Sequence, residues 1–179
     1  IMESFKNRQR LERANAELAR IHMLDPMTGI YNRMVFYKNV RKLISKAEKQ
    51  GVGVWDFSND MDNLKKINDL YGHNEGDKAI KAVASLMTKC TAEGGICSRF
   101  GGDEFVAVIA ETDGADSFYE KVSRSIAEYN RRSKSPYDVS ISCGYKAGKP
   151  KTLKEIDDLM KASDREMYTQ KRKHHSRRD

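Results

Sequence analysis

The chain has 179 residues, 33% of them charged, and its 33 Lys and Arg residues outnumber 26 Asp and Glu residues to give a net charge of +7. This length allows one domain of ordinary size with a substantial core, and the basic balance favours anionic partners: nucleotides, nucleic acid or a membrane surface. No apolar run reaches membrane-spanning length and no signal peptide is visible, so we expect no membrane contact by these residues.

The first residue and the cysteines indicate the setting of the chain. It begins with Ile1 instead of Met, which suggests a fragment of a longer protein whose sensor or membrane-bound portion lies upstream. An odd number of widely spaced cysteines argues against a disulfide framework and against a zinc site; they are Cys90, Cys97 and Cys143. We expect reduced, buried thiols in a cytoplasmic domain.

Residues 1–24 form the predicted N-terminal helical segment, since residues 3–24 contain no Gly or Pro. Apolar residues recur there at three- and four-residue steps and form one narrow seam of Leu11, Ala14, Leu18 and Ile21. The seam covers fewer than two heptads, so two interpretations remain open. The segment is either a dimerising coiled coil that couples an upstream sensor, or a helix that lies on the domain's own core. Pro26 and Gly29 end it.

Helical spacing next predicts a helix over residues 34–49, with a core face of Val35, Phe36, Val40, Leu43, Ile44 and Ala47. Residues 52–59 are typical of a strand, and acidic residues separate it from a short helix predicted over residues 63–71. Free N–H groups at a helix start bind phosphate, and carboxylates at a strand end can hold Mg²⁺. Because Asp60 and Asp62 alternate in direction if the strand continues, only one of them need face such a site. The alternative is that an Asp simply caps the helix.

Residues 72–77 are predicted to form a turn, with Asp77 at the head of a helix that reaches Cys90. A Gly101-Gly102 hairpin turn then joins two strands, and the five apolar residues 105–109 indicate a strand buried on both faces. Asp103 and Glu104 lie at the mouth of that strand. They suit a divalent cation beside a bulky anion, since the glycines let a ligand approach, or they form a solvated hairpin tip.

The remaining pattern predicts a helix over residues 113–132, a strand over 139–145 and a last helix over 152–174. The alternation of helices and strands indicates an α/β (α+β) domain over residues 25–174, with helices covering a sheet whose central hairpin is antiparallel. Residues 175–179 form a basic tail. It lacks interleaved aromatic residues, so a solvated helix end is favoured over a nucleic-acid patch and no nucleic-acid partner is expected.

Five blocks, in chain order, carry a resemblance to a known family. They are Asp25-x-x-Thr28-Gly29-x-x-Asn32-Arg33; Asp60-x-Asp62-x-x-Lys65-x-Ile67-Asn68-Asp69-x-x-Gly72-His73-x-x-Gly76-Asp77; Arg99-x-Gly101-Gly102-Asp103-Glu104-Phe105; Ser142-x-Gly144; and Asp164-x-x-Met167-Tyr168-x-x-Lys171. With this order and spacing, residues 25–172 resemble a GGDEF domain, the family of the diguanylate cyclases. The resemblance implies a fold like that of nucleotide cyclases and polymerase palms, with an antiparallel-rich sheet that presents acids to metal ions.

The resemblance also implies an activity: two GTP molecules are joined into cyclic di-GMP, and pyrophosphate is released. It implies two Mg²⁺ (or Mn²⁺) ions per active site, held by the side chains of Asp60, Asp103 and Glu104 and by the backbone carbonyl of Met61. Asp60, Asp103 and Glu104 are the implied catalytic residues. The implied substrate-binding residues are Asn63, Leu64, Lys65, Asn68, Asp77, Gly101, Gly102 and Lys171, of which Asn68 and Asp77 read guanine. A homodimer is implied because each protomer holds one GTP.

The chain departs from the family pattern at several positions. An inhibitory Arg-x-x-Asp site is expected to be absent, because Ala92 and Gly95 occupy its positions. Leu64 stands where phenylalanine is frequent, and the strand before Asp60 is unusually polar. The residues after Lys171 leave a second phosphate-binding arginine open, with Arg172 and Arg177 as candidates. A non-catalytic module that binds GTP or cyclic di-GMP remains the alternative function.

Overall fold

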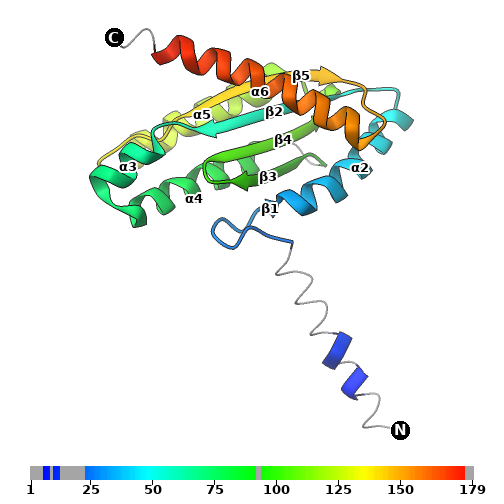
Figure 1. Cartoon of the computed structure of the whole chain (residues 1–179), viewed down its shortest axis with the longest axis horizontal. Coiled ribbons are helices and arrows are strands. Elements are labelled where there is room, and N and C mark those ends of the chain that lie inside the picture. The colour runs from blue at the N-terminus through cyan, green and yellow to red at the C-terminus, as the bar shows by residue number, and fades with distance from the viewer. Residues whose placement is uncertain (1–5, 9, 13–22, 92–93, 176–179) are drawn as a thin grey trace.

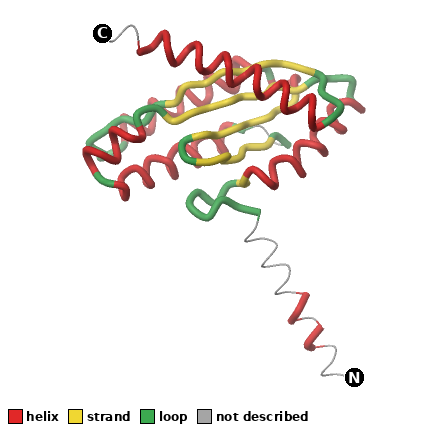
Figure 2. Tube along the Cα trace, in the orientation of Figure 1, coloured by secondary structure: helices red, strands yellow, loops and turns green. Residues whose placement is uncertain are grey.

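The computed structural model describes residues 6–8, 10–12, 23–91 and 94–175. Helices cover both faces of one five-stranded sheet (Figures 1 and 2). The elements in chain order are β1 (Tyr31–Asn32), α2 (Arg33–Lys49), β2 (Val54–Met61), α3 (Leu64–Tyr71), α4 (His73–Cys90), β3 (Ile96–Gly101), β4 (Glu104–Ala110), a 3₁₀ turn (Glu111–Asp113), α5 (Ala115–Arg132), β5 (Ile141–Gly148) and α6 (Leu153–His175). The predicted α+β class is confirmed.

The sheet has the strand order β1-β3-β4-β2-β5, in which only β1 pairs in parallel, with β3. Alternation along β4 divides the core into two layers, as expected for a strand buried on both faces. Phe105, Ala107 and Ile109 pack with α3, α4 and α5 on one side. Val106 and Val108 pack with α2 and α6 on the other side. The buried strand predicted from residues 105–109 is therefore confirmed.

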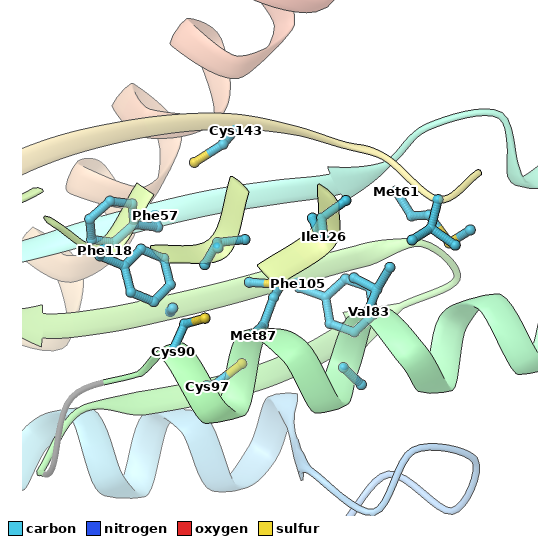
Figure 3. Close-up of a cluster of buried hydrophobic side chains, with 14 of the residues drawn as sticks. Phe57, Met61, Val83, Met87, Cys90, Cys97, Phe105, Phe118, Ile126 and Cys143 are labelled. Carbon is cyan, nitrogen blue, oxygen red and sulfur yellow. The ribbon is translucent and has the colours of Figure 1, made fainter. Parts of the chain in front are cut away.

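Figure 3 shows the layer beneath α4 and α5, which includes all three cysteines among aromatic and aliphatic side chains. The three thiols are buried and unbridged, as predicted. Burial raises the pKa of the Cys97 and Cys143 thiols to about 12, so both remain protonated at neutral pH. Within the described residues, no helix combines the length and the apolar character needed to cross a bilayer.

Helix α2 follows its sequence pattern closely. The Asn32 side chain accepts a hydrogen bond from the Val35 N–H at 3.0 Å and caps the first turn. All six residues predicted to face the core are buried.

Helix α6 lies directly on β5, and a Cβ atom at Gly144 would be only 2.2 Å from the Ser163 carbonyl oxygen. Glycine is therefore needed at this position for α6 to approach the sheet.

Four local predictions are wrong. Strand β1 is missing from the predicted elements, and β2 continues through Met61 instead of ending before Asp60. The predicted turn over residues 72–77 is helical from His73 onward, and Gly72, with φ +89°, is the N-cap of α4. Gly101 pairs with Glu104 as the last residue of β3, so the hairpin turn consists of Gly102 and Asp103.

The predicted N-terminal helix is described only in part. Residues 6–8 and 10–12 are helical, and the Leu11 side chain is 62% exposed. The other seam residues, Ala14, Leu18 and Ile21, lie outside the described residues, as does Ala92. The division of the chain at residues 24 and 174 stays a prediction.

Candidate active site

The site is built around Asp60 near the end of β2, where it pairs with Glu104 of β4 on one side and Ser142 of β5 on the other. Directly paired residues on antiparallel strands point to the same face, with Cβ atoms about 4.5–5.5 Å apart. Asp60 and Glu104 therefore present their carboxylates to the face that α6 covers. Lys171 of α6 reaches this face, and its Nζ atom donates to Asp60 Oδ1 at 2.5 Å.

The electrostatics of this group are dominated by carboxylates. Partial burial raises the pKa of Asp60, and the charges of Asp103 and Asp62 raise it further, against the opposing effect of Lys171. Burial alone would lower the pKa of Lys171, but the same three carboxylates outweigh burial and raise it. The site therefore holds more negative charge than one lysine balances, which favours cation binding.

The hairpin turn brings Asp103 to the end of β2, because the Met61 N–H donates to the Asp103 carbonyl at 2.9 Å. Gly102 supplies the positive φ of +41° in this turn. Arg99 holds the turn: its Nε and Nη2 atoms donate to the Gly102 carbonyl at 3.0 and 2.7 Å. Its Nη1 atom contacts both carboxylate oxygens of Asp25, at 3.2 and 3.0 Å.

Asp25 joins the loop before α2 to this hairpin. Its carboxylate also accepts from the Thr28 N–H at 2.9 Å and from the Thr28 hydroxyl at 2.7 Å. Burial opposes ionisation of Asp25, but these bonds and Arg99 hold its pKa below the usual value. Asp25, Thr28 and Arg99 were not among the predicted site residues, although their place in the motif blocks was a signal for them.

The segment after β2 forms a start for α3 that can bind an anion. Asn63 is the N-cap, and it has φ +59°, the one non-glycine positive φ in the described part of the chain. The first N–H groups of α3, which include those of Leu64 and Lys65, have no acceptor within the helix, and the Asn63 side chain makes no capping hydrogen bond to them. The Leu64 side chain is partly buried and that of Lys65 is exposed. The alternative of an Asp N-cap is wrong, because Asn63 holds that position.

The predicted guanine readers lie on two consecutive helices, Asn68 on α3 and Asp77 on α4. They approach at Gly76, where a Cβ atom would be only 1.8 Å from Asn68 Oδ1. Asp77 follows Gly76 directly and is partly buried. Leu64 and Asn68 are about 6 Å apart along the axis of α3. The structure thus places the Asn68 side chain against Gly76, the residue before Asp77.

The predicted metal ligands are brought together only in pairs. Among the described residues, no group of three or more His, Cys, Asp and Glu residues is close enough to hold a metal ion. Asp60 and Glu104 are direct cross-strand partners, and the charge of Asp103 raises the pKa of Asp60. All the donors are carboxylate or carbonyl oxygens, the ligands that Mg²⁺ and Mn²⁺ prefer, so the donor chemistry fits these ions.

Two neighbouring features complete the site. A cavity of about 360 Å³ opens beside Glu104 between α2 and α6, with Arg33 and Lys161 among its lining residues. Beyond Lys171, the Arg172 guanidinium packs over the Tyr168 ring at 5.4 Å. Arg172 therefore has an aromatic partner within its own helix, and the other candidate, Arg177, lies outside the described residues.

Comparisons with known proteins identify the family of the chain. The family model "Diguanylate cyclase, GGDEF domain" matches residues 22–177. Diguanylate cyclase DgcP of Escherichia coli (strain K12) is 32% identical over 167 residues, which are 92% of this chain and 49% of that protein. DgcM from the same strain is 33% identical over 153 residues, 82% of this chain and 35% of DgcM. The chain thus spans about a third to a half of the length of these relatives.

Solved structures show the same fold. The coiled coil and GGDEF domain of DgcB from Caulobacter crescentus, in complex with c-di-GMP, has a TM-score of 0.82 at 24% identity and covers 96% of this chain and 92% of its own. Diguanylate cyclase SiaD from Pseudomonas aeruginosa, in complex with its activator SiaC, has a TM-score of 0.75 at 24% identity, covering 96% of this chain and 66% of its own. Because the family model matches most of its length, the chain belongs to the GGDEF domain family of diguanylate cyclases.

Proposed function

We propose that this domain is a diguanylate cyclase that condenses two GTP molecules into cyclic di-GMP and releases pyrophosphate. The observation that carries the proposal is the cross-strand pair Asp60 and Glu104, with Lys171 over it and the Asp103 turn beside it. Carboxylates beside an uncapped helix start and a lysine are the parts that phosphoryl transfer from a nucleotide requires.

The triphosphate binds between α3 and α6 in this proposal. The free N–H groups of Asn63, Leu64 and Lys65 donate to phosphate oxygens, and Gly101 and Gly102 let the phosphates approach the hairpin backbone. Lys171 contributes its charge to the terminal phosphates.

Asn68 and Asp77 provide the selectivity for guanine. The Asp77 carboxylate accepts the N1–H and N2–H₂ donors of the base together. Adenine offers no such pair, so it would leave the carboxylate unpaired at a cost of about 1–3 kcal/mol. Because Asp77 is partly buried, water does not fully replace the hydrogen bonds that guanine would make to its carboxylate.

Asp60, Asp103, Glu104 and the Met61 carbonyl are the proposed ligands of two Mg²⁺ or Mn²⁺ ions. When bound, such ions neutralise charge on the phosphates and make the 3′-hydroxyl of the ribose more acidic. Glu104 is exposed at the first position of β4, the central strand, where its carboxylate can accept the proton of that hydroxyl. The 3′-oxygen then bonds to the α-phosphorus of the second GTP, and the bond from this phosphorus to pyrophosphate breaks.

The reaction requires two sites that face each other, so we propose a two-fold homodimer in which each protomer holds one GTP. The N-terminal segment would then transmit the state of an upstream sensor domain to the dimer. The unbridged thiols support a reducing, cytoplasmic setting.

One observation favours a second function, a non-catalytic module that binds GTP or cyclic di-GMP. Asp60 contacts Lys171, and the described residues contain no cluster of three carboxylates. If that arrangement persists with nucleotide bound, the domain would bind GTP and leave it unchanged.

The test is to incubate the purified chain with GTP and Mg²⁺ and to measure cyclic di-GMP by mass-resolved chromatography, beside the Asp103→Ala variant. The proposal predicts product from the wild-type chain and none from the variant. GTP that binds and stays intact, even when dimerisation is forced, would identify the binding module instead.

A further inference from the structure

Asp62, the residue after β2, makes three hydrogen bonds to Ser140, just before β5, and to Ser142 within it. Its carboxylate accepts from the Ser140 hydroxyl at 3.0 Å and from the Ser142 hydroxyl at 2.6 Å. Its N–H donates to the Ser140 carbonyl at 2.9 Å. Both partners are 78 to 80 residues away in sequence. Asp62 therefore anchors the segment that follows β2 to a distant part of the chain.

The neighbouring Met61 is anchored to the β3–β4 hairpin on the opposite side, because its N–H donates to the Asp103 carbonyl at 2.9 Å. The chain between β2 and α3 is thus held from both sides. The residue that follows is Asn63, whose left-handed conformation costs a non-glycine residue about 1–3 kcal/mol. Such a conformation persists where the surroundings impose it, and the bonds of Asp62 lie directly before it.

This conformation decides where the start of α3 points. The left-handed residue turns the chain sharply between strand and helix, and the uncapped N–H groups of α3 come directly after it. Loss of the Asp62 bonds would let Asn63 relax to a conformation with negative φ and turn those groups away. The two carboxylates of this segment therefore have different partners: Asp60 contacts Lys171, and Asp62 contacts two serines.

We propose that Asp62 is a positioning residue: through Ser140 and Ser142 it holds Asn63 in the left-handed conformation that directs the N–H groups of residues 63–65 at the nucleotide triphosphate. Asp62 is not a metal ligand in this assignment. The identity of the ligand rests on the proposed function, whereas the anchoring of Asn63 by the hydrogen bonds of Asp62 does not.

The anchoring of this segment by Asp62 is tested first without nucleotide, by amide hydrogen exchange of residues 61, 62 and 67, whose N–H groups donate to the carbonyls of Asp103, Ser140 and Asn63. We expect exchange about tenfold faster in Asp62→Ala and in the double variant Ser140→Ala/Ser142→Ala. Asp62→Asn should restore part of the protection, because its amide can accept from one hydroxyl and donate to the other. Ser45→Ala, on the exposed face of α2, is the matched control. Equal exchange in all variants, with unchanged melting temperatures, would overturn the proposal.

The role in binding is tested with the α-thio analogue of GTP and Mg²⁺. We expect about a tenfold weaker Kd in Asp62→Ala and in the double serine variant, and no further loss when the three changes are combined. The Mg²⁺ concentration for half-maximal binding should stay unchanged. A Mg²⁺ requirement that shifts in Asp62→Ala but not in the double serine variant would make Asp62 a metal ligand and refute the assignment.

The two tests distinguish the anchoring of Asn63 by Asp62 from the proposed function. Failure of the wild-type chain to bind the analogue, with the exchange pattern as expected, would remove the proposed function and the ligand while leaving Asp62 as the group that holds Asn63. If the wild-type chain binds the analogue but hydrogen exchange is unchanged in the Asp62 and serine variants, only the anchoring role of Asp62 would be refuted.

Discussion

Asp56 offers the sharpest test of the electrostatics of this fold. It lies in the middle of β2, with 0% of its surface exposed, between Val108 of β4 and Lys146 of β5. Neither carboxylate oxygen has a hydrogen-bond partner among the described residues. The Lys146 ammonium pairs with Glu166 of α6 at 2.9 Å instead. Burial therefore raises the pKa of Asp56 to about 7, with the neighbouring Ser163 hydroxyl opposing the rise.

This pKa shift fixes the size and the sign of a change in folding stability with pH. An unfolded Asp titrates at about 3.8, so between about pH 4 and pH 7 the folded chain keeps a proton that the unfolded chain has lost. Stability contributed by the protonated carboxyl is fully present below pH 3.8 and is lost as pH rises through the folded pKa. The loss amounts to about 4 kcal/mol, a large part of the stability of an ordinary domain.

Asp56→Asn removes this titration at nearly constant volume. We expect the variant to exceed the wild-type chain in free energy of unfolding by about 4 kcal/mol at pH 8.5, with the difference disappearing toward pH 4. Urea unfolding followed by the fluorescence of Trp55, the single tryptophan, measures it. Asp158→Asn, at an exposed position of α6, should show no such pH dependence. A difference that is constant with pH, or a variant that is less stable at pH 8.5, would refute the reasoning.

Three further substitutions test the packing around the site. Gly144→Ala places a Cβ atom 2.2 Å from backbone atoms of α6, so we expect a loss of about 1–3 kcal/mol in urea unfolding, together with weaker GTP binding as Lys171 moves. Gly76→Ala meets the Asn68 side chain instead, so GTP affinity should fall about tenfold with little loss of stability, and an unchanged affinity would contradict the role of Asn68. Lys171→Met should weaken GTP binding but not guanosine binding; an equal loss for both ligands would contradict its contact with phosphate.

The local elements were predictable where periodicity alone decides them. The six buried positions of α2 and the doubly buried strand at residues 105–109 follow directly from the apolar pattern. The start of α4 does not, because Gly72 and Gly76 in the sequence indicate a turn. Gly72 is indeed a cap, but Gly76 lies within the helix, where its missing Cβ leaves room for Asn68. A glycine required by packing has the same sequence signal as one required by a turn.

Long-range contacts explain the rest. The two-residue strand β1 exists through pairing with β3, and a register shift between Arg99 and Gly101 moves the hairpin turn by one residue. The unusual polarity of β2 was visible in the sequence, but the lack of a hydrogen-bond donor for Asp56 was not. Likewise, the motif blocks contain Asp62 and Ser142, but no sequence pattern pairs Asp62 with Ser140 and Ser142, which lie 78 and 80 residues further on.

The most direct measurement of the central claim is the stoichiometry and concentration dependence of GTP turnover by the wild-type chain with Mg²⁺. We predict two pyrophosphates for each cyclic di-GMP, and a rate per protomer that rises with protein concentration until the dimer is saturated. Pyrophosphate without cyclic di-GMP, or intact GTP at every protein concentration, would contradict the assignment of Asp60, Asp103 and Glu104 to this reaction.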